Sequence, residues 1–265
     1  MHGDMRDSRR VDHQALTQGA FSGAMAFAKA APLVVLDTMI LAALVDLARR
    51  LMLPTGSASP YLIGTVEAAL NVFVFAPMMI AAHRYSVAGM VTPRLSGSLA
   101  GPIFGRFVKA SLILSLITVA GYGGGAFLSE ALGPPLGTVI FFMAFAATIA
   151  LSVRIGPLFP AISVNANGAG WGAAWRDTAG HGWAIFFVLA LCSLPFIFLG
   201  LPLEAAMLEV ETLRVAGLIL TLVRAVIETG WTLVLACAAG LIYKELAREL
   251  LLAPPSGGAS GGNHG

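Results

Sequence analysis

Polar side chains interrupt three of the long apolar runs in this sequence. Asp37 lies in the first run, Glu67 and Asn71 in the second, and Arg224 and Glu228 in the last. An ionisable group at the centre of a membrane helix costs about 2.5–3.5 kcal/mol to insert, so such residues are the first candidates for chemistry or for helix pairing. Asp37 is close to the start of its run, and we expect it to be accessible to water or to cap its helix.

Spacing and depth predict that the other four residues meet. Arg224 and Glu228 are four residues apart, so they share a helix face and can form an ion pair. Glu67 lies about 9 Å, and Arg224 about 13 Å, below the outer start of its own run, at 1.5 Å per residue. We therefore expect an intramembrane polar cluster of Glu67, Asn71, Arg224 and Glu228. It serves either as a proton or solute site of a transporter or as an ion-pair network that fixes which helices touch.

No catalytic motif accompanies this cluster. The sequence has no strand-to-helix nucleophile elbow, no H-E-x-x-H pair, no Cys/His set with zinc spacing and no phosphate loop. Cys192 and Cys237 fall inside apolar runs, where cysteine behaves as a small buried hydrophobe. We therefore expect no enzymatic activity, no cofactor and no metal. A lipid-modifying enzyme would need His83, His181 and an acid such as Asp177 to converge.

The composition is typical of a protein that lies in a bilayer. Of the 265 residues, 57% are hydrophobic and 11% are charged, whereas soluble domains average about 45–50% and about 25%. A spanning helix takes roughly 20 apolar residues. We predict an all-α, polytopic membrane helical bundle of about six transmembrane helices. They are expected at Pro32–Leu51, Tyr61–Ala82, Ile103–Leu128, Pro135–Val153, Trp183–Leu201 and Val215–Tyr243.

The basic residues predict the orientation of this bundle. With a cytoplasmic N-terminus, twelve of the 16 Lys and Arg residues fall on the cytoplasmic side. Arg49, Arg50 and Arg214 fall outside, and Arg224 lies within a span. This bias follows the positive-inside rule, so we expect both termini in the cytoplasm and a location in the bacterial inner membrane.

Three stretches that precede spans alternate small apolar and polar residues at helical spacing. They are His13–Lys29, Ser96–Lys109 and Gly170–Gly180, and each is expected to form an interfacial amphipathic helix. Each would begin a unit of one interfacial helix and two spans, which suggests three copies of one unit. We predict a single transmembrane domain over residues 13–252. Residues 1–12 and the Pro/Gly/Ser-rich tail at 253–265 are expected to be disordered.

Bases, histidine and tryptophan gather at the expected cytoplasmic ends of the helices. Pro157 and Pro160 should end the fourth span there, and the following helix should lie flat at headgroup level. The side chains expected at this interface, where they either bind anionic lipid headgroups or are simply solvated, are His83, Arg84, Arg154, Trp175, Arg176, Trp183 and Lys244.

The segment Leu151–Phe186 carries a further pattern. An Arg at a helix end is followed by a Phe-Pro-Ala turn, a Gly-containing loop, a helix with Trp, Thr-x-Gly and a second Trp. The matching residues are Arg154, Phe159, Pro160, Ala161, Gly168, Trp175, Thr178, Gly180 and Trp183. This pattern, with the helix end at His83 and Arg84, resembles uncharacterised bacterial six-helix membrane proteins allied to the membrane domain of glycerophosphoryl diester phosphodiesterase. Where such proteins commonly continue into Gly-Glu, this chain has Gly89 and Met90. The resemblance implies a membrane domain and does not imply phosphodiesterase activity.

These features lead to two functional hypotheses. The first is a non-enzymatic integral membrane protein with a support or accessory role. The second is a small-solute or proton-coupled transporter that uses the intramembrane Glu/Arg cluster. Membrane lipids are the expected partners. A formal net charge of +2 is too small to indicate nucleic-acid binding, and neither a protein partner nor an oligomeric state follows from the sequence.

Overall fold

The described part of the chain is mostly helical and contains no strand. The computed structural model describes residues 12–52, 60–99, 101–210, 215–248 and 250–251. Residues 1–11 and 252–265, which include most of the two predicted terminal segments, lie outside it. Asp12 had been placed in the first of these segments, but its side chain caps the first helix by accepting from the backbone N–H of Ala15 at 3.0 Å. The helices are α1 (His13–Ala30), α2 (Pro32–Met52), α3 (Pro60–Ala88), α4 (Ser96–Leu99), α5 (Pro102–Leu132), α6 (Leu136–Ile155), α7 (Leu158–Ser163), α8 (Trp171–Asp177), α9 (Gly182–Glu209) and α10 (Val215–Leu246).

The prediction of an all-α polytopic bundle is confirmed. The six expected runs coincide with α2, α3, α5, α6, α9 and α10. Five of these helices are long and apolar enough to cross a membrane by themselves, and α2 qualifies only together with α1, from which it is bent by 97°. Helix α2 does not qualify by itself because it carries too many charges: its 21 residues include Asp37, Asp46, Arg49 and Arg50.

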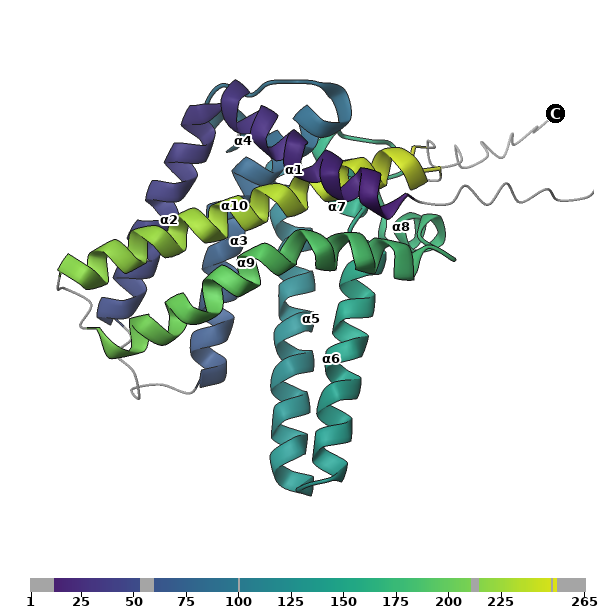
Figure 1. Cartoon of the computed structure of the whole chain (residues 1–265). Helices are drawn as coiled ribbons and strands as arrows, with labels where there is room; N and C mark the ends of the chain where they lie inside the picture. The colour runs from purple at the N-terminus through teal and green to yellow at the C-terminus, as the bar shows by residue number, and fades with distance from the viewer. Residues whose placement is uncertain (1–11, 53–59, 100, 211–214, 249, 252–265) are drawn as a thin grey trace, which may run out of the picture.

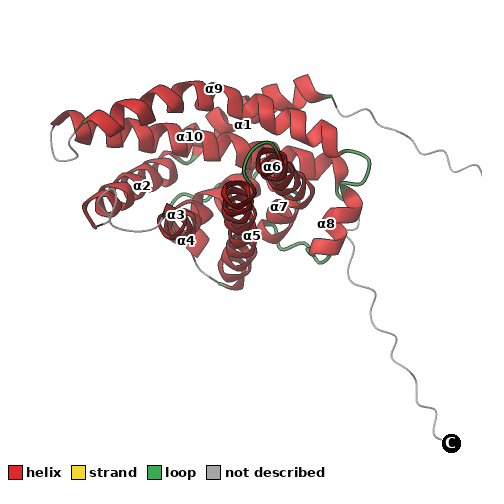
Figure 2. Ribbon diagram, turned by 90° about the horizontal axis from the view of Figure 1, so that it is seen from below, coloured by secondary structure: helices red, strands yellow, loops and turns green. Residues whose placement is uncertain are grey.

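Two groups of helices cross one another in the bundle. Figure 2 shows α1, α9 and α10 running lengthwise along one side, with α2, α3 and α5 on the other. The α5–α6 hairpin projects away from the remaining helices (Figure 1). Helices α3 and α10 lie at the centre, because about half of the most apolar part of each is buried, against 17% in α5, α6 and α9.

Small residues allow helices to pack closely around α10. Helices α1, α2, α3 and α9 all contact it. Gly23 of α1 faces Cys237, and a methyl group added at Gly19 would lie 3.0 Å from the Leu241 side chain. Cys192 and Cys237 are fully buried in the same core, as the sequence predicted. Small residues at helix contacts are the usual way for membrane helices to approach closely, since lipid supplies little hydrophobic driving force between them.

The three predicted interfacial stretches differ in outcome. Helix α1 covers the whole of the first, and its buried Ala20 and Phe27 pack into the core. In the second stretch only Ser96–Leu99 forms a separate helix, because residues 102–109 are the opening turns of α5, which begins with Pro102 at its first position. A single interfacial helix over Ser96–Lys109 was therefore wrong. The third stretch contains α8.

The contact between α3 and α10 supplies a test of this packing. We expect Gly240→Ala to destabilise the protein by about 1–3 kcal/mol, because the new methyl group would overlap the Ser86 side chain. Gly200→Ala in α9 is the matched control, since nothing lies within 4 Å of its added methyl group and replacing a helical glycine is then neutral or favourable. The free energy of unfolding in detergent is measured for both variants, and equal effects would contradict this packing.

Candidate functional site

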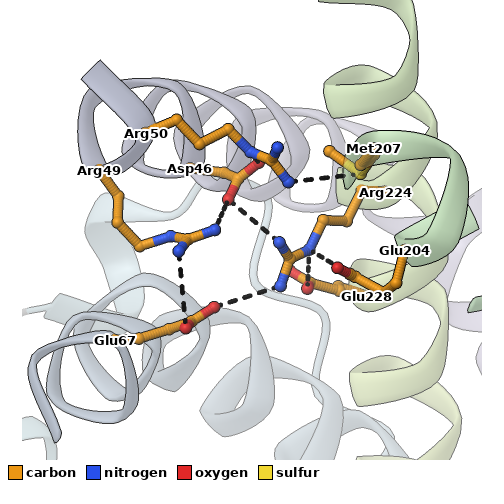
Figure 3. Close-up of polar contacts among 8 residues, drawn as sticks. All are labelled: Asp46, Arg49, Arg50, Glu67, Glu204, Met207, Arg224 and Glu228. Atoms are coloured by element: carbon orange, nitrogen blue, oxygen red, sulfur yellow. Dashed lines mark hydrogen bonds and ion pairs between the residues drawn. The ribbon is translucent and has the colours of Figure 1, made fainter. Parts of the chain in front are cut away.

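The guanidinium of Arg224 is the centre of a charged cluster between four helices. Its Nε lies 2.7 Å from Glu228 Oε1 on the same helix and 3.2 Å from Glu204 Oε1 on α9. Its Nη1 lies 3.3 Å from Asp46 Oδ1 on α2, and its Nη2 lies 3.2 Å from Glu67 Oε1 on α3. Figure 3 shows all four carboxylates pointing toward this one cation. Arg224 therefore joins α2, α3, α9 and α10.

Two further arginines complete the cluster from the last turn of α2. Arg49 Nη2 donates to Asp46 Oδ1 at 2.7 Å, and Arg50 Nε donates to Asp46 Oδ2 at 2.8 Å. Spacings of three and four residues place these side chains on one face of the helix. Arg49 Nη1 also lies 3.9 Å from Glu67 Oε2. The charged cluster thus consists of Asp46, Arg49, Arg50, Glu67, Glu204, Arg224 and Glu228 (Figure 3).

The interior of the cluster holds almost no free space. The side chains of Arg224 and Asp46 are 14% and 11% exposed, whereas that of Glu204 is 52% exposed. The cavity at the cluster has a volume of about 10 Å³ and is lined by Asp46, Glu67, Asn71 and Arg224 among others. A cavity needs about 10–15 Å³ to hold one water molecule. The space therefore admits at most a single water.

The structure brings together the residues that the depth comparison predicted to meet. Glu67 approaches Arg224, Glu228 pairs with Arg224, and Asn71 lines the same cavity. Asp37 is exposed and takes no part in the cluster.

Sequence reasoning missed four members of the cluster, Asp46, Arg49, Arg50 and Glu204. The positive-inside count predicts that the two arginines lie on the outer side of the membrane. The signal that could have found them is the spacing of Asp46, Arg49 and Arg50, which allows both bases to bind one carboxylate. Arg50 also donates from Nη2 to Met207 Sδ on α9 at 3.4 Å.

A second group of polar contacts joins the ends of α3, α6 and α10 through the short helices α7 and α8. Arg84 Nε donates to the backbone oxygen of Ser163 at 2.9 Å. The Arg154 guanidinium carbon lies 4.8 Å from the centre of the Trp175 ring, and its Nη1 lies 3.4 Å from the Trp175 backbone oxygen. Thr178 Oγ1 lies 2.8 Å from the backbone oxygen of Ala174 and 3.2 Å from that of Arg154, so its one proton is shared between them. We call the region of Arg84, Arg154, Arg176 and Lys244 the basic end of the bundle.

The residues expected at the interface differ in their exposure. Trp183 is 76% and Trp175 46% exposed, and Arg176 and Lys244 are also exposed. His83 is not at the surface, so its prediction as an interfacial side chain was wrong. It is wholly buried, its Nδ1 lies 3.0 Å from Ser163 Oγ, and its ring packs 5.9 Å from that of Phe107. The physical reason is that α7 folds back over the end of α3.

The groups that a lipid-modifying enzyme would have needed make other contacts. His83 faces Ser163 on α7. Asp177 Oδ2 accepts from the backbone N–H groups of Arg248 and Leu250, at 2.9 and 3.0 Å, just beyond the end of α10. Asp177 therefore holds the end of α10 against α8.

No family model, curated protein or solved structure matches this chain. We therefore infer its function from its own contacts.

Because Arg224 lies at the centre of the cluster, we expect its removal to lower the stability of the protein strongly. Arg224→Gln should lower the free energy of unfolding by about 3 kcal/mol or more, because it leaves carboxylates of four helices facing one another without their shared cation. Arg94→Gln, at an exposed base, is the control and should change it by about 0.5 kcal/mol or less. Thermal and denaturant unfolding in detergent measures both. A loss no larger than that of the control would show that Arg224 does not hold the helices together.

Proposed function

We propose that this protein is a non-enzymatic integral membrane protein with a support or accessory role, and that its charged cluster serves as a structural lock. The observation that carries this proposal is the pairing of the cluster around a cavity of about 10 Å³. Each guanidinium binds at least one carboxylate, and the carboxylates come from four helices. A solute site needs space beside its polar groups, and this cluster leaves room for at most one water.

Breaking one partner of such a network is costly, since it leaves an uncompensated charge in a poorly solvated place. The cluster therefore disfavours bundles in which α2, α3, α9 or α10 is rotated or shifted along its axis. A rigid, specified bundle is what a support or accessory subunit offers to other membrane components.

We place the protein in the bacterial inner membrane with both termini in the cytoplasm. Most of the bases in the sequence fall on that side. Four bases are expected on the outside or within a span. Carboxylates match the charges of Arg49, Arg50 and Arg224, and Arg214 lies outside the described residues. Even with Arg49, Arg50 and Arg214 counted on the outer side, the twelve bases of the cytoplasmic side outnumber them and favour this orientation.

We also propose that the likeness to six-helix proteins allied to the glycerophosphoryl diester phosphodiesterase membrane domain reflects a shared structural unit. Residues of the pattern contact one another: Arg154 stacks on Trp175, and Thr178 donates to the Arg154 backbone oxygen. Such a unit fastens the end of α6 to α8. It accounts for the pattern without any catalytic step.

A proton-coupled transporter is the second candidate, and the charges of the cluster favour it. Four carboxylates face three guanidiniums in the described chain. One carboxylate is thus in excess and can hold a proton, and Glu204 is half exposed. Intramembrane carboxylates beside a base occur on proton pathways.

Glu228→Gln separates the two roles. The structural role predicts a loss of about 1–3 kcal/mol of stability, because Glu228 accepts the shortest hydrogen bond of Arg224. It also predicts that proteoliposomes containing wild-type protein leak protons no faster than empty ones, measured with a pH-sensitive dye. Unchanged stability together with a wild-type proton flux that the variant loses would instead establish transport.

Labelling of introduced cysteines tests the orientation. Glu209→Cys, at the exposed end of α9, should react with a membrane-impermeant maleimide from the outer side of spheroplasts. Arg94→Cys, exposed between α3 and α4, should react only after the membrane is permeabilised. The native Cys192 and Cys237 are buried and supply little background. The reverse pattern would invert the proposed topology.

A further inference from the structure

A large cavity lies between α6 and α9, beside the basic end. Its volume is about 550 Å³, within the range of about 300–1,000 Å³ typical of ligand sites. Ala146 and Ala150, one turn apart on α6, line it and leave room where larger side chains would fill the space. Phe145 and Phe186 also line it. We call this cavity the α6–α9 groove. Figure 1 shows α6 and α9 diverging beyond the point where they meet.

The groove has the depth of one membrane leaflet. Along α6 it extends from Arg154 back to Phe145, which is about 13 Å at 1.5 Å per residue. Half of a hydrocarbon core of about 30 Å is about 15 Å. A second cavity of about 270 Å³ shares Ile149, Val153 and Phe186 with the groove and continues it toward α5. An extended acyl chain fits this depth and this apolar lining.

A cation stands at one end of the groove. Within the described residues, the contacts of the Arg154 guanidinium are with Trp175 and not with a carboxylate. The Trp175 ring holds the guanidinium in place, and no carboxylate among the described residues pairs with its charge. Gly182 lines the same end, where α9 begins without a side-chain cap, and the free N–H groups of a helix N-terminus also favour an anion. Trp183, 76% exposed beside them, suits the depth of lipid headgroups.

We propose that the α6–α9 groove binds one anionic phospholipid, with its phosphate at Arg154 and one acyl chain along Ala150 and Ala146. A basic pocket between membrane helices is the chemistry that recognises anionic headgroups. This site lies apart from the charged cluster and goes beyond the structural role proposed for the protein. The proposal names the class of ligand, an anionic phospholipid, and the position in the bundle at which it binds.

Native mass spectrometry of the full chain released from nanodiscs tests the proposal. The probes are phosphatidylglycerol and phosphatidylcholine with identical acyl chains. Wild-type protein should retain one phosphatidylglycerol and prefer it over phosphatidylcholine by about fivefold, the effect of one base near an anionic headgroup. Arg154→Gln should abolish this preference, and Arg154→Lys should keep it. Lys244→Gln, at an exposed base of the same end, is the control and should leave the preference unchanged.

A second pair of variants tests the groove without touching Arg154. Ala146→Phe fills it and should reduce retention of both lipids by about fivefold or more, whereas Ala147→Phe, on the same helix but outside the lining, should not. Four results would overturn the proposal. They are equal retention of the two lipids by wild-type protein, equal effects of Arg154→Gln and Lys244→Gln, equal effects of the two phenylalanines, or a second copy of the chain in place of lipid.

Discussion

A guanidinium in a poorly solvated place has to be matched, because arginine does not lose its proton in proteins. Arg224 meets this constraint with four carboxylates, one each from α2, α3, α9 and α10. Glu228 pairs with Arg224 within α10, and each of the other three pairs forms only when its two helices have one relative rotation and one relative depth. The position of α10 within the bundle follows from these pairs, and the arginines of α2 match the remaining charge of Asp46 and Glu67.

The C-terminal half of α10 packs against its neighbours through small, uncharged residues. Toward its C-terminal end α10 presents Cys237 and Gly240, against which α1 and α3 pack. Small residues cannot define depth as sharply as an ion pair, but they let backbones approach. The two halves of α10 are thus complementary, since ion pairs set the register and small residues set the distance.

Apolar run length was enough to predict the six long helices, and depth was enough to predict that Glu67 meets Arg224. The rest of the cluster escaped prediction for a physical reason. Arg49 and Arg50 lie at the end of a helix. A base in this position indicates on which side of the membrane the helix ends, unless its carboxylate partner is known. Glu204 lies beyond Leu201, where the fifth span was expected to stop, because α9 continues through Pro202 to Glu209. His83 was misplaced because nothing in its local sequence shows that α7 folds over it.

The charged cluster also explains why the groove is open. Glu204 and Met207 hold the end of α9 toward Arg224 and Arg50, on the side of α2 and α10. Helix α6 contributes no charge there and packs mainly against α5 in the projecting hairpin. It also contacts α9, and near Arg154 the Trp175 ring and Thr178 fasten it to α8. Two helices fixed at one end and held by different partners at the other must diverge. In a bilayer this apolar space is where the proposed phospholipid would place an acyl chain, and Arg154 stands at its rim, where the phosphate is proposed to bind.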